Sequence, residues 1–254
     1  MRKKELKILL DQEAERYEHL DFIAEDPIQI PHRFEKKEDI EIAAFLSAVI
    51  AWGQRKTIIR NADRLMNMMD DAPYEFIREH GREDAEKLSS FVHRTFNGID
   101  LIYFMKALQF IYKEKEGLEG SISKLYQEED DLQSAIARFK ELFFSLEHEK
   151  RSEKHLPDPF RGSAAKRINM FLRWMVRPNG REVDFGLWKG IPTSALHLPL
   201  DVHTGNIARK LGLLKRKQND QKALQEIMEV LREFDPEDPV KYDFALFGMG
   251  VYGE

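Results

Sequence analysis

The stretch EDIEIAAFLSAVIA, residues 38–51, is apolar almost all the way round when it is placed on a helix. A helix without a polar face is normally buried, so this stretch predicts a central helix that is covered on several sides. The next stretch, GQRKTIIRNADRLMNMMD (residues 53–70), breaks the pattern at Gly53 and then resumes an amphipathic helical spacing. Strand-like alternation is sustained nowhere in the chain. The sequence therefore predicts an all-α protein.

Helical spacing also predicts helices on both sides of this centre. We expect them at residues 1–20, 73–80, 99–114, 131–147, 162–177, 204–213, 220–233 and 238–248. Two stretches interrupt the helical pattern, a proline-marked connection at residues 26–34 and a charged, then proline-rich, stretch at residues 147–159. We expect residues 1–254 to form a single two-lobed helical unit. One lobe would lie mainly within residues 38–150, and the other would combine residues 1–37 with residues 151–254.

Residues 178–200 keep no helical period and contain three prolines and three glycines. A structureless connection of this length inside a compact domain is usually functional or disordered. Its apolar residues argue against disorder, so we expect an ordered loop that packs on the core and leads to Asp201. These apolar residues are Phe185, Leu187, Trp188, Ile191 and Leu196.

The composition is that of an ordinary globular protein, with 42% hydrophobic and 33% charged residues and no cysteine. The absence of cysteine excludes disulfides, thiolate zinc sites and iron–sulfur clusters, and it fits a reducing cytosol. No apolar run reaches the roughly 18 residues of a membrane span, and the first 20 residues lack the apolar core of a signal peptide. We expect a monomeric cytoplasmic protein with no membrane partner.

The formal net charge of −5 conceals an uneven distribution. Residues 151–217 contain 14 Lys or Arg against 5 Asp or Glu, so this segment is strongly basic within an acidic chain. Such a segment favours an anionic partner for one face of the protein. The alternative is that the charges cluster by chance on solvated helices.

The stretch LPLDVHTGNIARKLGL, residues 198–213, places Asp201 after an apolar run and just before a predicted helix. Asp201 and Thr204 are both suitable N-cap residues, because their side chains accept hydrogen bonds from the free N–H groups of a first turn. On local sequence alone, Asp201 is most simply a helix cap.

Three segments resemble the helix-hairpin-helix base-excision DNA glycosylases, the endonuclease III superfamily. LDVHTGNIARKLGL (200–213) resembles the segment that holds their essential aspartate, and RGSAAKRINMFLRWM (161–175) resembles the hairpin and helix that carry the lysine nucleophile of bifunctional members. AAFLSAVIAWGQRKTIIRNADRLM (43–66) resembles the buried helix that ends in a glutamine beside the flipped base. LWKGIPTSALHLPLD (187–201) and the terminal VYGE are similar to the archaeal 8-oxoguanine DNA glycosylase branch and to a related bacterial family of unknown function.

The resemblance implies a two-lobed helix-hairpin-helix glycosylase fold and the excision of a damaged base from duplex or single-stranded DNA, with 8-oxoguanine as the first candidate. It also implies strand cleavage as an AP lyase, with Lys166 as nucleophile and Asp201 as electrostatic stabiliser. Gln54 would lie beside the everted base, with Trp52, Met170 and Phe244 lining the base pocket. DNA would contact Arg161, Gly162, Ser163 and Arg167. Neither a cofactor nor a metal ion is implied.

These residue types suit the chemistry. Breaking an N-glycosidic bond gives the sugar oxocarbenium character, which a nearby carboxylate stabilises. A neutral amine can attack the anomeric carbon and then form a Schiff base that permits strand cleavage. The Arg167 cation and the positive end of a helix would favour a neutral amine at Lys166. On the residues alone, however, Lys166 is most simply a surface lysine, and Trp52, Met170 and Phe244 are most simply core residues.

Other interpretations stay open. The hairpin keeps a single glycine, Gly162, where typical members are glycine-rich, so Ser163 and the first N–H groups of the Lys166 helix would have to hold a phosphate. The chief alternative is a non-catalytic DNA-binding protein that retains the fold, and free nucleosides or modified RNA are further possible substrates. No HExxH spacing is present, so we expect no metal site and interpret His203 as a packing residue beside Asp201. LLKRKQND (213–220) either contacts phosphates or forms a solvated turn, and we favour the turn.

Overall fold

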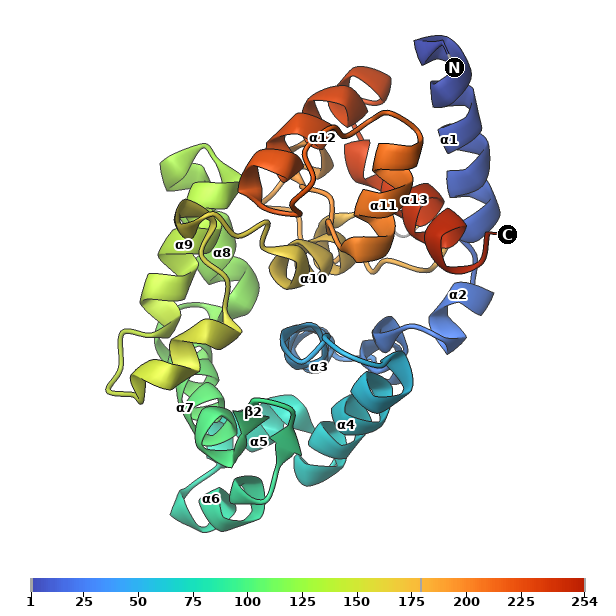
Figure 1. Ribbon diagram of the computed structural model, residues 1–254. Coiled ribbons are helices and arrows are strands. Elements are labelled where there is room, and N and C mark those ends of the chain that lie inside the picture. The colour runs from blue at the N-terminus through green and yellow to red at the C-terminus, as the bar shows by residue number, and fades with distance from the viewer. Residues whose placement is uncertain (1, 179, 254) are drawn as a thin grey trace. The chain divides into compact units, whose positions relative to one another are not determined.

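The computed structural model describes residues 2–178 and 180–253. Helices account for 67% of the chain and strands for 2%, which confirms the predicted all-α class. The chain divides into two compact units (Figure 1). Unit 1 combines the residues up to Ala24 with those from Asp158 onward, and unit 2 spans residues 25–157. No helix in the described part of the chain is both long and apolar enough to cross a membrane.

Unit 2 is built around two buried helices. One is α3 (Lys37–Val49), which buries every residue from Ile40 to Val49 and so confirms the prediction of a central helix. The other is α7 (Gly98–Glu114), whose Phe104 lies 6.3 Å, centroid to centroid, from Phe45 of α3. The remaining elements of unit 2 are η1 (Pro27–Gln29), η2 (Pro31–Arg33), α4 (Arg55–Met68), α5 (Pro73–Glu79), α6 (Arg82–Ser89), β1 (Val92–His93), β2 (Phe96–Asn97), α8 (Gly117–Glu129), α9 (Leu132–Phe143) and η3 (Lys150–His155).

The division between the units falls at different residues from those expected at 37/38 and 150/151. Residues 25–37 lie in unit 2, where Arg33 forms ion pairs of 2.6 Å with Asp63 and with Asp71. Residues 151–157 also lie in unit 2, because the fully buried carboxylate of Asp100 accepts hydrogen bonds from Arg151 and Ser152. Residues 25–37 and 151–157 were expected to belong to the other lobe. Both segments are instead part of unit 2.

Two α-helices and one β-hairpin of unit 2 were not predicted. Helix α6 has only eight residues and two apolar side chains, Ala85 and the buried Leu88, too few to form an apolar stripe that the sequence would show. Helix α8 begins at Gly117, in the left-handed region at φ 76°, and it contains two glycines that lower its helix propensity. Strands β1 and β2 form a two-residue antiparallel hairpin that pairs His93 with Phe96, too short for an alternating pattern.

Unit 1 packs its first and last helices together. Helix α1 (Lys3–Tyr17) lies beside α13 (Tyr242–Val251), which also packs on α11 (Val202–Lys210) (Figure 1). Gly248 is required at the first contact, because a Cβ there would lie 2.2 Å from the Tyr17 ring. The other elements of unit 1 are α2 (Asp21–Ala24), η4 (Pro159–Arg161), α10 (Lys166–Val176), η5 (Thr193–Ala195), α12 (Gln221–Phe234) and η6 (Pro239–Lys241).

The loop after α10 is ordered and packs on the core, as predicted. Trp188 is 1% exposed and meets Phe171 of α10 edge to face at 5.3 Å. Two backbone N–H groups, from Phe185 and Trp188, donate to carbonyls of the last turns of α10. The loop therefore runs back along α10 before it reaches Asp201.

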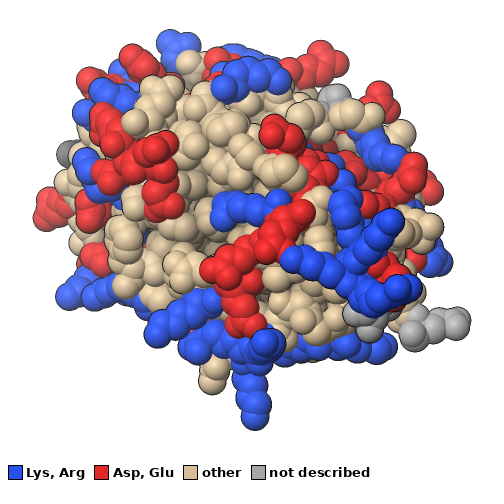
Figure 2. Space-filling model, turned by 90° about the horizontal axis from the view of Figure 1, so that it is seen from above, with Lys and Arg blue, Asp and Glu red and all other residues tan. Residues whose placement is uncertain are grey.

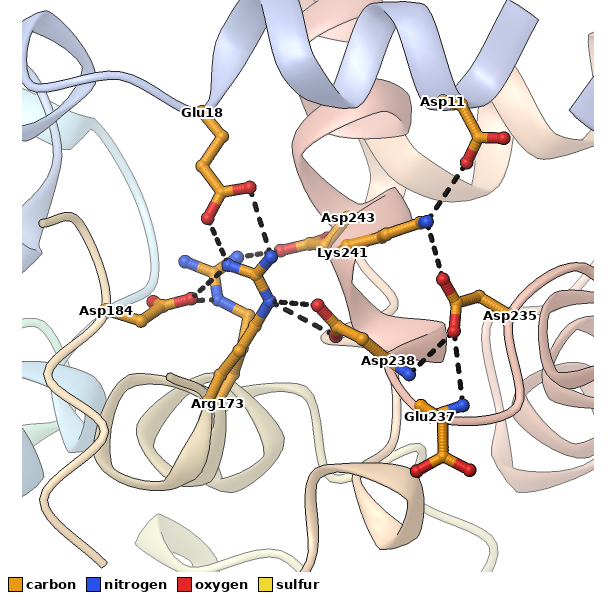
Figure 3. Close-up of polar contacts among 10 residues, drawn as sticks. Asp11, Glu18, Arg173, Asp184, Asp235, Glu237, Asp238, Lys241 and Asp243 are labelled. Atoms are coloured by element: carbon orange, nitrogen blue, oxygen red, sulfur yellow. Dashed lines mark hydrogen bonds and ion pairs between the residues drawn. The ribbon is translucent and has the colours of Figure 1, made fainter. Parts of the chain in front are cut away.

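A buried ion cluster joins five segments of unit 1 (Figure 3). Arg173 of α10 pairs with Asp184 at 3.2 Å and with Asp243, while Arg177 pairs with Glu18 and, at 2.9 Å, with Asp238. Burial alone would lower the pKa of Arg177. The hydrogen bond to Glu18 and the nearby carboxylates of Asp184 and Asp238 have a larger, opposite effect. The pKa of Arg177 is therefore above its usual value, and this guanidinium stays charged. The cluster fixes α10 against the end of α1, the following loop, η6 and α13.

On the surface, in contrast to the buried cluster, charged side chains of both signs are mixed and exposed to solvent. The face drawn in Figure 2 shows Lys and Arg interspersed with Asp and Glu. Arg181 and Glu15 form such a surface pair at 2.9 Å, with side chains that are 45% and 70% exposed.

Arg177→Leu tests the buried cluster. It leaves buried carboxylates without their cation, so we expect the free energy of unfolding to fall by about 3–5 kcal/mol. Urea denaturation followed by circular dichroism measures this change. The control, Arg181→Leu, removes an exposed pair and should cost at most about 1 kcal/mol. Equal losses in the two variants would show that the buried cluster does not stabilise unit 1 as described.

Candidate functional site

Lys166 is the first residue of α10, which confirms the prediction that it starts a helix. The turn before it is fixed by side chains. Ser163 Oγ accepts a hydrogen bond of 3.1 Å from the Ala165 N–H, and the Asn169 side-chain amide donates to the Ala164 carbonyl at 3.0 Å. Ala165 takes the left-handed conformation at φ 47°. Lys166 is half-buried rather than fully exposed.

Asp201 is the N-cap of α11, as the simplest interpretation of the sequence predicts. Its Oδ1 accepts a hydrogen bond of 2.9 Å from the Thr204 N–H. No described residue donates to its Oδ2. Asn219 donates through Nδ2 to the Asp201 backbone carbonyl at 2.7 Å, which holds the cap from the other side. The half-buried carboxylate is therefore fixed by one oxygen and has the other available.

Asp243, at the start of α13, connects these two residues electrostatically. It is only 6% exposed, its Oδ2 pairs with Arg173, and its Oδ1 has no hydrogen-bond partner. Burial raises the pKa of Asp243 to about 7. The positive charges of Arg173 and Lys166 act to lower this pKa, and the negative charges of Asp201 and Asp184 act to raise it. Lys166 at the start of α10 and Asp201 at the start of α11 are therefore both within electrostatic reach of this carboxyl group.

Sequence analysis did not predict Asp243. An acidic residue in an otherwise apolar helix was the available signal, because a buried carboxylate requires a partner. Helical spacing on α10 was a second signal. Lys166, Met170, Arg173 and Arg177 recur at intervals of three or four residues, which places them on one face of the helix.

Two of the predicted pocket residues in unit 1 are buried. Met170, one turn after Lys166, is 8% exposed. Phe244 is 1% exposed, meets Phe22 edge to face at 5.4 Å, and has the Arg173 guanidinium carbon 4.4 Å from its ring centroid. This is core packing, the alternative left open by the sequence, and it covers the ring that was expected to act as a base plate. Phe247, one turn further along α13, is half-buried and was not predicted.

The other two predicted pocket residues, Trp52 and Gln54, lie in unit 2 between α3 and α4. Trp52 is half-buried, meets the His93 ring edge to face at 4.9 Å, and stacks on His155 at 5.9 Å. Gln54 is exposed at the N-cap position of α4, where its side chain forms no capping hydrogen bond. Gly53, between them, has a φ of 107°, in the left-handed region that favours glycine.

The four residues expected to contact DNA surround the start of α10. Gly162 ends η4 with a φ of 86°, and a Cβ placed there would meet no atom within 4 Å. Arg161 is exposed, whereas Ser163 and Arg167 are half-buried. Burial lowers the pKa of Arg167 to about 10, so the group remains a cation at pH 7. Arg161 is therefore the most accessible cation of the four.

Some features of unit 1 lie outside this group. His203 is exposed and meets Phe247 edge to face at 6.3 Å, so it packs on α13, but it forms no hydrogen bond with any described residue. A surface hollow lined by Glu18–Asp21 and Gly180–Glu182 contains none of the predicted site residues. Within residues 2–178 and 180–253, no three His, Asp or Glu side chains converge to form a metal site. Of the terminal VYGE motif, residue 254 lies outside the described residues.

Residues 26–252 match the model of a protein family described as "Protein of unknown function (DUF2400)". The chain belongs to this family. The match begins after α1 and α2 and includes every candidate residue of this DUF2400 protein. No curated protein and no solved structure matches the chain. The family description assigns no activity, so a function has to be argued from the residues themselves.

The buried carboxyl of Asp243 predicts a pH dependence of stability. Its pKa is about 7 in the folded protein and about 3.8 when unperturbed. Between these values the folded state keeps a proton that the unfolded state has lost, so this group makes the free energy of unfolding fall as the pH rises from about 4 to about 7. Asp243→Asn should remove up to about 4 kcal/mol of that fall.

Urea unfolding of both proteins between pH 4.5 and 7.5 checks this difference. The control is Asp21→Asn, at a carboxylate that is 97% exposed, and it should follow the wild type at every pH. A constant difference between wild type and Asp243→Asn across the range would contradict a raised pKa at Asp243.

Proposed function

We propose that this chain is a helix-hairpin-helix DNA glycosylase that excises a damaged base and can cleave the resulting site as a lyase. Lys166 is the nucleophile and Asp201 the electrostatic stabiliser in this proposal. The observation that carries it is the position of an amine and a carboxylate at the starts of two helices of unit 1, α10 and α11, both within electrostatic reach of the buried Asp243. The resemblance of the three sequence segments supplies the reaction class.

Lys166 has surroundings that suit a nucleophilic amine. It is half-buried at the first residue of α10, next to Arg167, and an amine held in this position can act as a nucleophile. Its nitrogen would bond to the anomeric carbon while the glycosidic C–N bond breaks and the base leaves with the bonding electrons. The two protons of the amine pass to the departing base and to the ring oxygen as the bond between the anomeric carbon and that oxygen breaks, which gives the Schiff base.

Asp201 would act on the charge that develops on the sugar. Its Oδ1 is occupied by the helix cap, which fixes the carboxylate before any substrate binds. A fixed negative charge stabilises an oxocarbenium-like transition state without having to reorganise during the reaction. The cap and the catalytic interpretation of Asp201 are therefore compatible.

The substrate in this proposal is DNA with an everted damaged base, and 8-oxoguanine is the first lesion to test. Eversion costs a few kcal/mol of unstacking, which contacts with the extruded base have to offset. The buried side chains of Met170 and Phe244 are no longer among the proposed base contacts, and the roles of Trp52 and Gln54 stay predictions from the resemblance. A non-catalytic DNA-binding protein is the alternative, and the single glycine of the hairpin favours it.

Borohydride trapping tests the nucleophile. Reduction during turnover on an oligonucleotide with 8-oxoguanine should cross-link the wild-type protein to DNA, because borohydride converts the Schiff base to a stable amine. Lys166→Gln should give no cross-link. The adduct is measured by its mobility in a denaturing gel.

Lys210→Gln, which changes an exposed lysine of α11, is the matched control and should retain the cross-link. A panel of other damaged bases extends the assay if 8-oxoguanine gives none. Persistence of the adduct in Lys166→Gln would identify another amine as the nucleophile. Absence of any adduct or base release across the panel would favour the non-catalytic alternative.

The variant Asp201→Asn distinguishes the helix-capping role of Asp201 from the role of its negative charge. Asparagine is also a good N-cap residue, so the loss of stability should stay well below the roughly 1 kcal/mol of a removed cap. Losing one preorganised electrostatic group commonly slows a reaction by about 100- to 1,000-fold. We therefore expect a folded variant that binds DNA and releases the base at least about 100 times more slowly in single-turnover assays.

The unfolding midpoint of Asp201→Asn in urea supplies the control for folding. A variant that is stable and excises the base at nearly the wild-type rate would reduce Asp201 to a helix cap, and the proposed mechanism would lose its stabiliser.

A further inference from the structure

The basic loop at residues 215–222 is joined to the hairpin before α10. The Gln221 N–H donates to the Gly162 carbonyl at 3.0 Å, and Ser163 pairs with Asp220 as an antiparallel bridge. Two segments more than 50 residues apart in the sequence thus form one surface. We call residues 158–163 together with residues 215–222 the hairpin–loop surface.

The loop is internally fixed, while Lys215, Lys217 and Gln218 within it are exposed. Arg216 pairs with Asp220, which also accepts the Ala223 N–H to cap α12. Glu226 accepts the Lys215 N–H at 2.6 Å, and the Arg209 guanidinium donates to the Arg216 carbonyl at 2.7 Å. The acidic groups of this region are therefore engaged by the loop itself.

Four exposed cations remain on this surface. No described carboxylate lies within ion-pair distance of their charged groups. They are Arg161, Lys215, Lys217 and Lys222. In the rest of the basic segment many cations are neutralised, since Arg173 and Arg177 lie in the buried cluster and Arg181 pairs with Glu15. Three of the four, Arg161, Lys215 and Lys217, belong to residues 151–217, whose other exposed cations without an ion pair among the described residues are Lys154 and Lys210.

An exposed aromatic ring lies beside these cations. Phe160 is 72% exposed within η4, and its N–H donates to the Asp158 side chain at 3.0 Å, so the turn that presents it is fixed. Cations that follow a phosphate backbone, combined with an aromatic ring for an unstacked base, are the combination by which proteins bind single-stranded nucleic acid.

We propose that the hairpin–loop surface binds a DNA strand, with Arg161, Lys215, Lys217 and Lys222 on successive phosphates and Phe160 stacked on an unpaired base. The proposal rests on the proposed function in taking DNA as the polymer, and it adds a contact surface beyond the residues at the start of α10. Its net positive charge complements a polyanion, and the ring gives it a preference for unpaired nucleotides.

Salt-dependent binding tests the cations. Fluorescence anisotropy with an undamaged single-stranded oligonucleotide, between 50 and 200 mM salt, gives the slope of log K against log salt. Each phosphate contact contributes about 0.7 to the slope on single strands, so the variant K215Q/K217Q/K222Q should flatten it by about 2. The matched control, K106Q/K113Q/K124Q, makes the same charge change at exposed lysines of α7 and α8 in unit 2 and should keep the wild-type slope.

Two variants test the ring. Phe160→Ala should weaken binding to the single strand by roughly tenfold through loss of one stacking contact. Phe160→Trp should retain the affinity, because tryptophan also stacks. Duplex DNA of the same sequence should be bound more weakly than the single strand by the wild type, and the Phe160→Ala change should narrow that difference.

Equal slopes for the two triple variants would overturn the proposal. So would binding of the wild type to anionic phospholipid vesicles but not to DNA, since the same cations would then serve a membrane. Because the oligonucleotide is undamaged, these outcomes are separate from those of the trapping assay. A flattened slope without any adduct or base release would support this surface and contradict the glycosylase proposal, whereas an adduct with unchanged slopes would contradict this surface alone.

Discussion

The pairing of two buried arginines with four carboxylates is the interaction on which unit 1 depends. Removing charges from water is costly, and the cost is offset only when each charge meets a partner with good geometry. Here Arg173 and Arg177 of α10 meet carboxylates from the end of α1, the loop after α10, η6 and α13. Each of these segments has to be in place for the charges to be compensated, so the cluster specifies one arrangement of unit 1.

The cluster also connects the stability of unit 1 to the candidate site. Lys166, Arg173 and Arg177 lie on one face of α10, so the contacts that hold the end of the helix also orient its start. Asp243 belongs to both groups, because it pairs with Arg173 and responds to the charges of Lys166 and Asp201. A buried carboxyl whose pKa lies near 7 is the kind of group found at functional sites, although ion-pair networks also produce such shifts. In this protein the network and the site are contiguous.

Local patterns in the sequence were sufficient for much of the fold. The apolar run of α3, the helix start at Lys166 and the cap at Asp201 all follow from residues within a few positions of one another. The ion cluster could not be predicted in this way, because Glu18 and Arg177 are 159 residues apart and nothing in either neighbourhood indicates the other. The burial of Phe244 could not be predicted for the same reason. The guanidinium groups that cover its ring belong to Arg173 and Arg177, which are distant from it in the sequence.

The distribution of charge shows why the content of Lys and Arg in a segment is a poor predictor of an anionic partner. The excess of Lys and Arg in residues 151–217 suggests a basic face, yet the most basic-looking helix of that segment uses its arginines internally. What remains accessible is set by tertiary hydrogen bonds, such as the one between Gln221 and Gly162 that brings a lysine-rich loop next to the hairpin. A loss of glycines from the hairpin therefore need not remove phosphate binding, because side-chain cations from a second loop can replace the backbone N–H groups that a glycine-rich turn would present. In the proposed arrangement, lysine side chains rather than a rigid backbone turn would contact a strand, so binding would depend more on charge than on the geometry of the hairpin.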